Sequence, residues 1–160
     1  MSESSNELPL NPALSFLQRV WELNHALERL SNQMERRIGI TAPQRFIVRC
    51  VGKYPGMTAG QLASILHLDR GSVSAALRRL EQQGILKRRR DPRDGRRVTL
   101  GLTPKGRTFD VSRSGTVESA VVHLLETSSK AEIEAARSVL SRLSAALAEE
   151  ETAMDQRLDP

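Results

Sequence analysis

The 160-residue chain contains 39% apolar and 27% charged residues, a balance that indicates one globular domain with helical extensions and excludes a largely disordered chain. Aromatic residues make up only 3%, so a core would consist mostly of Leu, Ile, Val and Ala. One cysteine, Cys50, excludes an intramolecular disulfide, no apolar run approaches the roughly 18–20 residues of a membrane span, and the first residues do not resemble a secretory signal. We therefore expect a cytoplasmic protein with no membrane partner.

Positive charge is concentrated in the middle of the chain. The formal net charge is +5, but residues 1–77 carry +2, residues 78–107 carry +8 and residues 108–160 carry −5. A basic segment between a near-neutral and an acidic one indicates a localised surface for a polyanion. A membrane-surface helix would place basic residues opposite bulky apolar ones, and residues 87–97 have no such face.

A long helix is predicted over residues 10–38, after a flexible tail at residues 1–9. Its apolar residues recur at helical spacing: Leu10, Leu14, Leu17, Trp21, Leu23, Leu27, Leu30 and Met34. This apolar surface is broader than one small domain needs to bury. The next helix begins at a capping box of Thr41 and Gln44, and it should end near Tyr54, before the Pro-Gly pair at residues 55–56.

Residues 58–84 are predicted to form a helix-turn-helix. A second capping box, Thr58 with Gln61, opens a short helix to about Leu66, and Asp69 caps a further helix over residues 70–83 that Gly84 ends. The expected buried side chains are Leu62, Ala63, Ile65, Leu66, Val73, Leu77 and Leu80.

The opposite face of the second helix is slim and polar, which suits entry into a DNA major groove. It presents Arg70, Gly71, Ser74, Ala75 and Arg78. Ser72 lies near the helix start, where its hydroxyl and the free backbone N–H groups can meet a phosphate. A plain helical hairpin with a solvated polar face is the alternative interpretation.

A two-stranded hairpin is predicted next, because ILKRRR and RRVTLGL flank a DPRDG turn. Directly after a recognition helix, such a hairpin is a wing whose arginine-rich tip can reach a narrow minor groove. We expect Asp94 to pair with the Arg96 guanidinium and Asp91 to shape the turn. A charged edge strand or a localisation signal are the alternatives for residues 87–97.

Two further helices are predicted to end the chain. Thr103 and Pro104 open one that runs to about Leu125, and Ser129 and Glu132 open the last. Apolar residues spaced three and four apart continue the last helix: Ile133, Ala136, Leu140, Leu143 and Leu147. The expected fold class is mainly α, a winged helix-turn-helix with a two-stranded β wing and additional N- and C-terminal helices.

The sequence resembles the multiple antibiotic resistance regulator (MarR) family of winged-helix transcription factors. The family's wing pattern, Asp-x-Arg, five residues and Leu-Thr, is met by Asp94, Arg96, Leu102 and Thr103. Its Leu-Glu-x-x-Gly pattern is met by residues 80–84, and the resemblance extends over nearly the whole chain.

The resemblance implies a homodimer in which residues 10–38 and 104–160 are dimerisation helices and residues 41–103 bind DNA. It further implies a palindromic operator, with helices 70–83 in successive major grooves about 34 Å apart and wing 88–99 in the minor groove. Arg96 would enter that groove, oriented by Asp94. The expected DNA-binding residues are Thr58, Arg70, Gly71, Ser72, Ser74, Ala75, Arg78, Arg93, Asp94, Arg96 and Arg97, of which Ala75 is smaller than the residue of many relatives.

Relatives commonly release DNA when a small phenolic or other aromatic effector binds between the dimerisation helices and the winged domain. At that junction the candidate contacts are Trp21, His25, Phe46 and Arg49, the last pairing with an acidic ligand; the alternative is that Trp21 and Phe46 are core and Arg49 is surface. Some relatives sense oxidants through cysteine. Cys50, between Val48 and Val51, is expected to be buried and unreactive instead.

No enzymatic or metal site is predicted. The histidines His25, His67 and His123 lack ligand-like spacing, and the chain has no phosphate loop, nucleophile elbow or dinucleotide fingerprint, so we expect no cofactor. The predicted function is a sequence-specific transcriptional repressor released by an effector. The alternatives are a non-specific architectural winged-helix protein and a redox-sensing regulator acting through Cys50.

Overall fold

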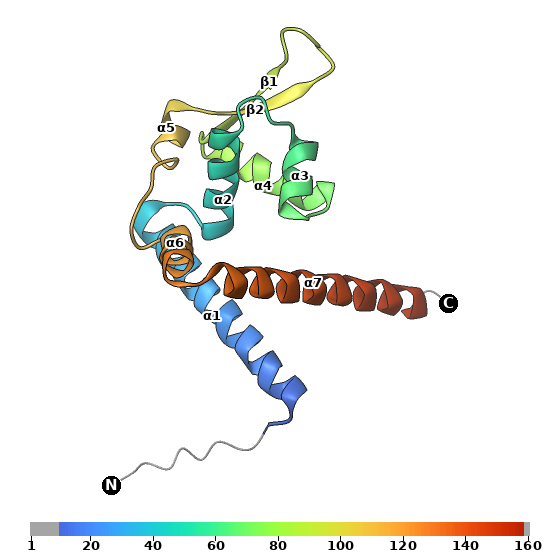
Figure 1. The fold of residues 1–160 in the computed structure, drawn as a ribbon. Helices are drawn as coiled ribbons and strands as arrows, with labels where there is room; N and C mark the ends of the chain where they lie inside the picture. Colours follow the sequence, from blue (N-terminus) through green and yellow to red (C-terminus); the bar gives the residue numbers. More distant parts are fainter. Residues whose placement is uncertain (1–9, 159–160) are drawn as a thin grey trace. The chain divides into compact units, whose positions relative to one another are not determined.

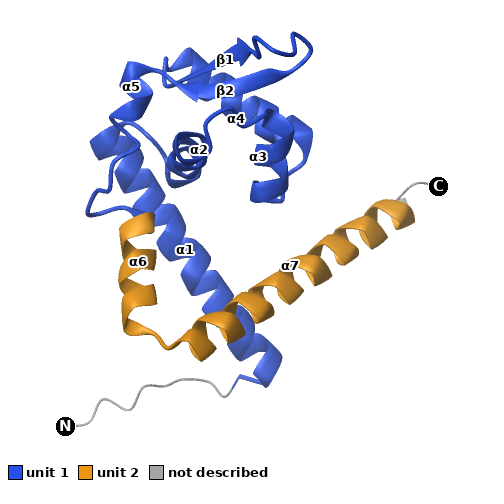
Figure 2. Cartoon of the chain, turned by 45° about the horizontal axis from the view of Figure 1, so that its top comes forward, with its two compact units in different colours: residues 1–117 blue, residues 118–160 orange. Residues whose placement is uncertain are grey.

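The computed structural model describes residues 10–158, over which the chain forms seven helices and a two-stranded sheet (Figure 1). The predicted fold class, mainly α with a β wing, is confirmed. The chain divides into two compact units, residues 1–117 and residues 118–160 (Figure 2). The predicted tail at residues 1–9 lies outside the described residues. Within the described part, no helix combines the length and the apolar character needed to traverse a bilayer.

The long first helix is α1 (Pro12–Ile38), and it begins and ends on strong local signals. The Asn11 side chain accepts the backbone N–H of Leu14, and Gly39 ends the helix in the left-handed conformation with φ 76°. Near its C-terminal end Met34 is buried, and the Ser31 hydroxyl accepts the Ala42 N–H at the start of the next helix. Most of the predicted apolar residues of α1 are exposed within this chain.

The helix-turn-helix is present as predicted, preceded by α2 (Ala42–Lys53). The expected burial of Ile65 is wrong, because its side chain is 41% exposed on the outer side of the first helix of the pair. Both capping boxes form, so α2 begins after Thr41 and α3 (Ala59–Leu66) begins after Thr58. His67 ends α3 in the left-handed conformation with φ 51°, and α4 (Arg70–Gln82) follows after Asp69. One apolar core joins α2, α3, α4 and the hairpin.

The hairpin consists of β1 (Leu86–Arg90) and β2 (Val98–Leu102), which pair antiparallel with Leu86 opposite Leu102 and Arg90 opposite Val98. Its base is part of the core, because Leu86, Leu100 and Leu102 are buried. The Leu100 N–H also donates to the Met57 carbonyl at 2.7 Å, which ties the segment before α3 to the hairpin. The predicted wing is therefore anchored at its base and free at its tip.

The predicted single helix over residues 104–125 is wrong. The structure has a short helix α5 (Pro104–Arg107), a non-helical segment over residues 108–116, and α6 (Val117–Thr127). The carbonyls of Phe109 and Val111 accept hydrogen bonds from the side chain of Arg45 on α2, an arrangement that a helical ladder would not provide. Gly115 adopts φ 73°, which breaks helical geometry just before α6.

The last helix is α7 (Lys130–Leu158), longer than its predicted apolar pattern. The predicted start is confirmed, because the Ser129 N–H and hydroxyl donate to Glu132 and the Glu132 N–H donates back to the Ser129 hydroxyl. None of the described side chains of α6 and α7 is buried.

Candidate nucleic-acid interface

The outer face of α4 is open to solvent, as its helical period predicts. Val73, Leu77 and Leu80 are at most 1% exposed and hold the helix on the core. On the other side Ser74 is half-buried, and the remaining predicted face residues are exposed: Arg70, Gly71, Ala75 and Arg78. This face is narrow and polar, with a cationic side chain at each end.

The N-terminus of α4 is already capped by a carboxylate. Asp69 Oδ1 accepts the Ser72 N–H at 2.9 Å, and the Ser72 hydroxyl donates to Asp69 Oδ2. These bonds, the hydroxyl first, lower the pKa of Asp69 below the range usual for aspartate. Asp69 is therefore the N-cap that the sequence predicts, and it engages both the backbone N–H and the hydroxyl of Ser72.

Two aspartates shape the wing tip through backbone hydrogen bonds. Asp91 Oδ1 accepts the Arg93 N–H at 2.9 Å, and the Asp91 N–H donates to the Arg97 carbonyl at 2.8 Å, so the predicted turn-forming role of Asp91 is confirmed. The Arg97 N–H donates to the Asp94 carbonyl at 2.9 Å. These bonds close the turn and leave the side chains of Arg93, Arg96 and Arg97 exposed.

The predicted pairing of Asp94 with the Arg96 guanidinium is wrong. In the described chain the Asp94 carboxylate forms no ion pair with Arg96, and Oδ1 instead accepts the Arg96 backbone N–H at 3.1 Å. A short carboxylate two residues earlier in a tight turn reaches the backbone more easily than the end of a long side chain. The Asp94 carboxylate therefore contacts the Arg96 backbone and not its guanidinium.

The sequence analysis did not predict the contacts that join α4 and the two residues after it to the hairpin and to the start of α5. Glu81 on α4 forms an ion pair with Arg88 on β1 at 2.9 Å, and Lys105 Nζ donates to the Gln83 carbonyl at 2.7 Å. The Thr103 hydroxyl donates to the Gly84 carbonyl at 2.6 Å. Glu81 belongs to the Leu-Glu-x-x-Gly pattern and Thr103 to the wing pattern. These two patterns are therefore the sequence features from which such contacts could have been predicted.

The four candidate effector contacts differ in their exposure and in their partners. Trp21 is 62% exposed and Phe46 is 53% exposed, so neither belongs to the core of this chain, and His25 is also exposed. Arg49 donates to an Asp110 carboxylate oxygen at 2.8 Å. A cavity of about 470 Å³ between α1, α2 and α4 is lined by none of the four.

Cys50 lies in the core and not at the surface. It is 7% exposed, and burial raises the pKa of its thiol. The expected buried thiol is confirmed. Within residues 10–158 no three His, Cys, Asp or Glu side chains are grouped in a way that could hold a metal ion.

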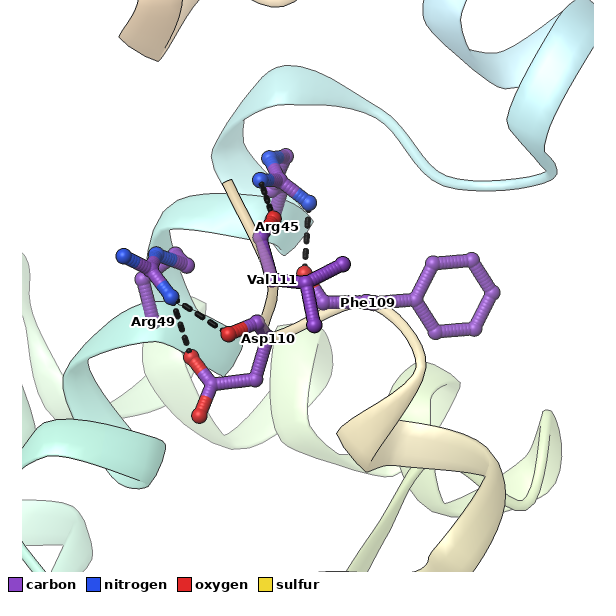
Figure 3. A network of polar contacts seen from close by, with 5 residues as sticks. All are labelled: Arg45, Arg49, Phe109, Asp110 and Val111. Atoms are coloured by element: carbon purple, nitrogen blue, oxygen red, sulfur yellow. Dashed lines mark hydrogen bonds and ion pairs between the residues drawn. The ribbon is translucent and has the colours of Figure 1, made fainter. Parts of the chain in front are cut away.

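One arginine of the structure is buried, which the sequence analysis did not predict. Arg45 is 2% exposed, and its guanidinium donates to the Phe109 carbonyl and, at 2.6 Å, to the Val111 carbonyl (Figure 3). One turn later Arg49 donates to the carbonyl and the carboxylate of Asp110. We call Arg45, Arg49 and residues 109–111 the arginine clasp. In the sequence, the burial of Arg45 is indicated only by its helical position, three residues before the buried Val48 and therefore on the same face of α2.

Comparisons with known proteins agree with this architecture. Residues 40–98 match the family model described as MarR family. The transcriptional regulator TtmR of Methylorubrum extorquens is 30% identical over 107 residues. That match covers 67% of this chain and 55% of TtmR, so the chain spans about half the length of this curated relative.

Two solved structures share the fold. The DNA complex of FabT from Streptococcus pneumoniae is 25% identical with a TM-score of 0.60, over 86% of this chain and 96% of that one. The DNA complex of MepR from Staphylococcus aureus is 23% identical with a TM-score of 0.65, over 83% and 95%. The family and the curated relative are named for transcriptional regulation and not for enzymatic activity. With its helix-turn-helix, wing and flanking helices, the chain belongs to the MarR family.

Proposed function

We propose that the protein is a dimeric transcriptional regulator that binds DNA in a sequence-specific way and represses until a small effector releases it. The observation that carries the proposal is the pairing of an exposed polar face on α4 with an arginine-tipped wing on the same rigid core. Its family membership supports the same function, and so do the DNA molecules in the FabT and MepR structures.

The proposed contacts divide into base-reading and backbone-binding groups. Ser74 and Ala75 lie in the middle of the exposed α4 face and would meet base edges, Ala75 through a thymine methyl. Arg96 would enter the minor groove from the wing tip. The remaining contacts would be mostly with phosphates, from Thr58, Arg70, Gly71, Arg78, Arg93 and Arg97. Ser72 and Asp94 would position neighbouring groups through the hydrogen bonds described above.

Unpartnered apolar residues on the long helices support a homodimer. On α7, Leu140, Leu147 and Met154 are seven residues apart, so they share one face, and they are 50%, 61% and 61% exposed. On α1, Leu14 and Trp21 are 50% and 62% exposed. Covering such stripes with a second copy removes apolar area from water. A two-fold dimer in turn requires a palindromic operator.

An aromatic effector would use the exposed rings of α1 and α2. Trp21 and Phe46 offer apolar surface that this chain leaves uncovered, and His25 is exposed on the same helix as Trp21. An acidic effector that pairs with Arg49 would have to compete with the Asp110 carboxylate. Effector binding would therefore be coupled to the arginine clasp.

Redox sensing through Cys50 is less well supported than effector release. A reactive thiol needs an exposed sulfur with a lowered pKa, whereas Cys50 is buried and its pKa is raised. Non-specific architectural binding is the stronger competitor, because it needs only the arginines.

Enrichment of a random duplex DNA pool on the purified protein, followed by sequencing, tests the proposal directly. An inverted repeat with half-sites about one helical turn apart is expected from a symmetric dimer. Binding without an enriched sequence would replace the proposal with the architectural function. Effectors are then screened by their ability to release the selected DNA.

The wing is tested on the selected operator. Arg96→Ala should weaken binding and reduce the salt slope by about one, because one phosphate-region cation is lost. Asp94→Asn keeps an acceptor for the Arg96 N–H and should bind nearly as well as the wild type, whereas Asp94→Ala should not. Equal losses for both Asp94 variants would favour a role for its charge.

A further inference from the structure

The arginine clasp fixes residues 109–111 against α2. A buried guanidinium is tolerated only when its N–H groups are bonded, and Arg45 bonds the carbonyls of Phe109 and Val111 (Figure 3). Arg49 adds bonds to the carbonyl and carboxylate of the residue between them, Asp110. Three consecutive residues of a non-helical segment are therefore held by two side chains from one helix.

Gly52 makes room for this arrangement. A Cβ atom at Gly52 would lie 2.1 Å from Asp110 Oδ2, so any larger residue requires the Asp110 carboxylate to move. Glycine is unfavourable inside a helix, yet it stands near the C-terminal end of α2. Arg45, Arg49 and Gly52 are four and three residues apart and share one face of the helix. The two arginine side chains and the space beside Gly52 thus form a site that accommodates the 109–111 backbone and the Asp110 carboxylate.

The clasp lies where the chain leaves the winged portion. Residues 108–116 connect α5, which follows the wing, to α6, the first C-terminal helix. On its other side α2 contributes Ile47, Val48 and Val51 to the core that also contains Leu77 and Leu80 of α4. The exit point of the chain is therefore held in a fixed relation to the recognition helix.

We propose that Arg45 and Arg49 are positioning residues that set which half-site spacing the dimer accepts. This inference rests on the proposed dimeric, operator-binding function. In a dimer joined through the terminal helices, two intact clasps would limit the distance and rotation that the two copies of α4 can adopt. Adding or removing one base pair changes the half-site separation by about 3.4 Å and rotates one half-site by about one-tenth of a turn. A dimer with intact clasps should therefore bind an operator with such an altered spacer more weakly.

The test measures affinity for one half-site sequence in inverted repeats whose spacer varies by single base pairs. The wild type should prefer its best spacing over the neighbouring spacings by about tenfold or more. Gly52→Ala and Arg49→Gln should reduce that preference to about threefold or less, while the base preference within each half-site stays unchanged. Gly52→Ala is the sharper variant, because its Cβ should displace the Asp110 carboxylate, whereas both arginines remain and alanine favours the helix.

Matched variants separate positioning from charge. Arg107→Gln removes the same single charge from an exposed side chain on α5 outside the clasp, and it should keep the wild-type spacing preference. Asp110→Asn keeps an acceptor oxygen for Arg49 and should fall between the wild type and Asp110→Ala. Loss of preference in Arg107→Gln to the same extent as in Arg49→Gln would overturn the proposal.

Amide hydrogen exchange of the full-length protein gives a second readout. In Gly52→Ala and Arg49→Gln, amides of residues 108–116 should exchange about tenfold faster, while those of α3 and α4 stay unchanged. Faster exchange with an unaltered spacing preference would show that the clasp orders the segment without setting spacing, which overturns the proposal. A wild-type protein that selects no inverted repeat would instead refute the dimeric function itself. Arg45→Gln is informative only if it folds, so the two milder variants decide the outcome.

Discussion

The winged portion and the C-terminal helices reach their structures by different routes. Helices α2, α3 and α4 and the hairpin share a core whose members include Ile40, Leu62 and Leu77, each 0% exposed. In α6 and α7, by contrast, no described side chain is buried, although both helices contain many apolar residues. The difference teaches that one chain completes the winged fold, whereas the C-terminal helices form on local signals and leave apolar side chains exposed, which the proposed dimer would cover.

Removing a core leucine should separate the two regions most clearly. Leu80→Ala empties a fully buried position and should lower the free energy of unfolding by about 2–5 kcal/mol. Leu147→Ala, at a position 61% exposed, should cost less than about 1 kcal/mol at low protein concentration. Urea titrations followed by circular dichroism measure both. Similar losses for the two variants would contradict the contrast.

A charge on the apolar face of α7 should act on assembly rather than on folding. Leu140→Glu places a carboxylate in the proposed dimer interface, and it should raise the dimer dissociation constant by about tenfold or more. Sedimentation equilibrium gives that constant. Arg142→Gln changes the net charge equally and lies about 200° around the helix, so it should leave dimerisation unchanged. A monomeric wild type would refute the proposed interface.

Asp69 at the start of α4 and Glu132 at the start of α7 allow the winged portion and the C-terminal helices to be compared as a function of pH. The pKa of Asp69 is lowered by the Ser72 hydroxyl and backbone N–H, so its cap stabilises the fold above the usual aspartate pKa of about 3.9. That stabilisation is lost as the pH falls through the lowered pKa. Asp69→Ala should therefore lower Tm by a few degrees near neutral pH, and the difference should shrink as the pH drops below about 4.

Glu132 provides the matched position at α7. Its pKa is also lowered, by the Ser129 hydroxyl and N–H. Because α7 contributes nothing to the core of the winged portion, Glu132→Ala should reduce helical content without shifting the cooperative transition of the winged portion. Thermal scans at several pH values decide this, and equal shifts from the two caps would argue for a single cooperative unit.

The smallest predicted effect concerns the labelling rate of the Cys50 thiol, which measures how often the winged core opens. This thiol is 7% exposed with a raised pKa, so a thiol reagent at neutral pH should label it about a hundredfold more slowly than in denaturant. Mass spectrometry of timed samples follows the labelling. Rapid labelling of the native protein would instead support the alternative function of thiol-based redox sensing.

Local rules predicted the helix starts well and the C-terminal connection poorly. Capping residues act over three or four positions, which is why Thr41, Thr58, Asp69 and Ser129 marked true helix starts. The break after Arg107 depends on α2, because hydrogen bonds from Arg45, more than 60 residues away in sequence, take the carbonyls that a helix would use.

The same division applies to the candidate interface. Helical period alone assigned the buried and exposed faces of α4, since a helix on a core has one dry side. It could not show that the Ser72 hydroxyl also donates to Asp69 or that Asp94 bonds a backbone N–H, because rotamer choice decides those contacts.

The sequence by itself determined the order of the elements, the helix-turn-helix, the wing and the family, all of which depend on spacing and composition. Only the tertiary structure distinguished exposed arginines that can meet DNA, such as Arg96, from Arg45, buried against the 109–111 backbone. The physical reason is that a guanidinium is compatible with solvent or with a buried site whose carbonyls satisfy it. Which of the two it meets depends on residues distant in the chain.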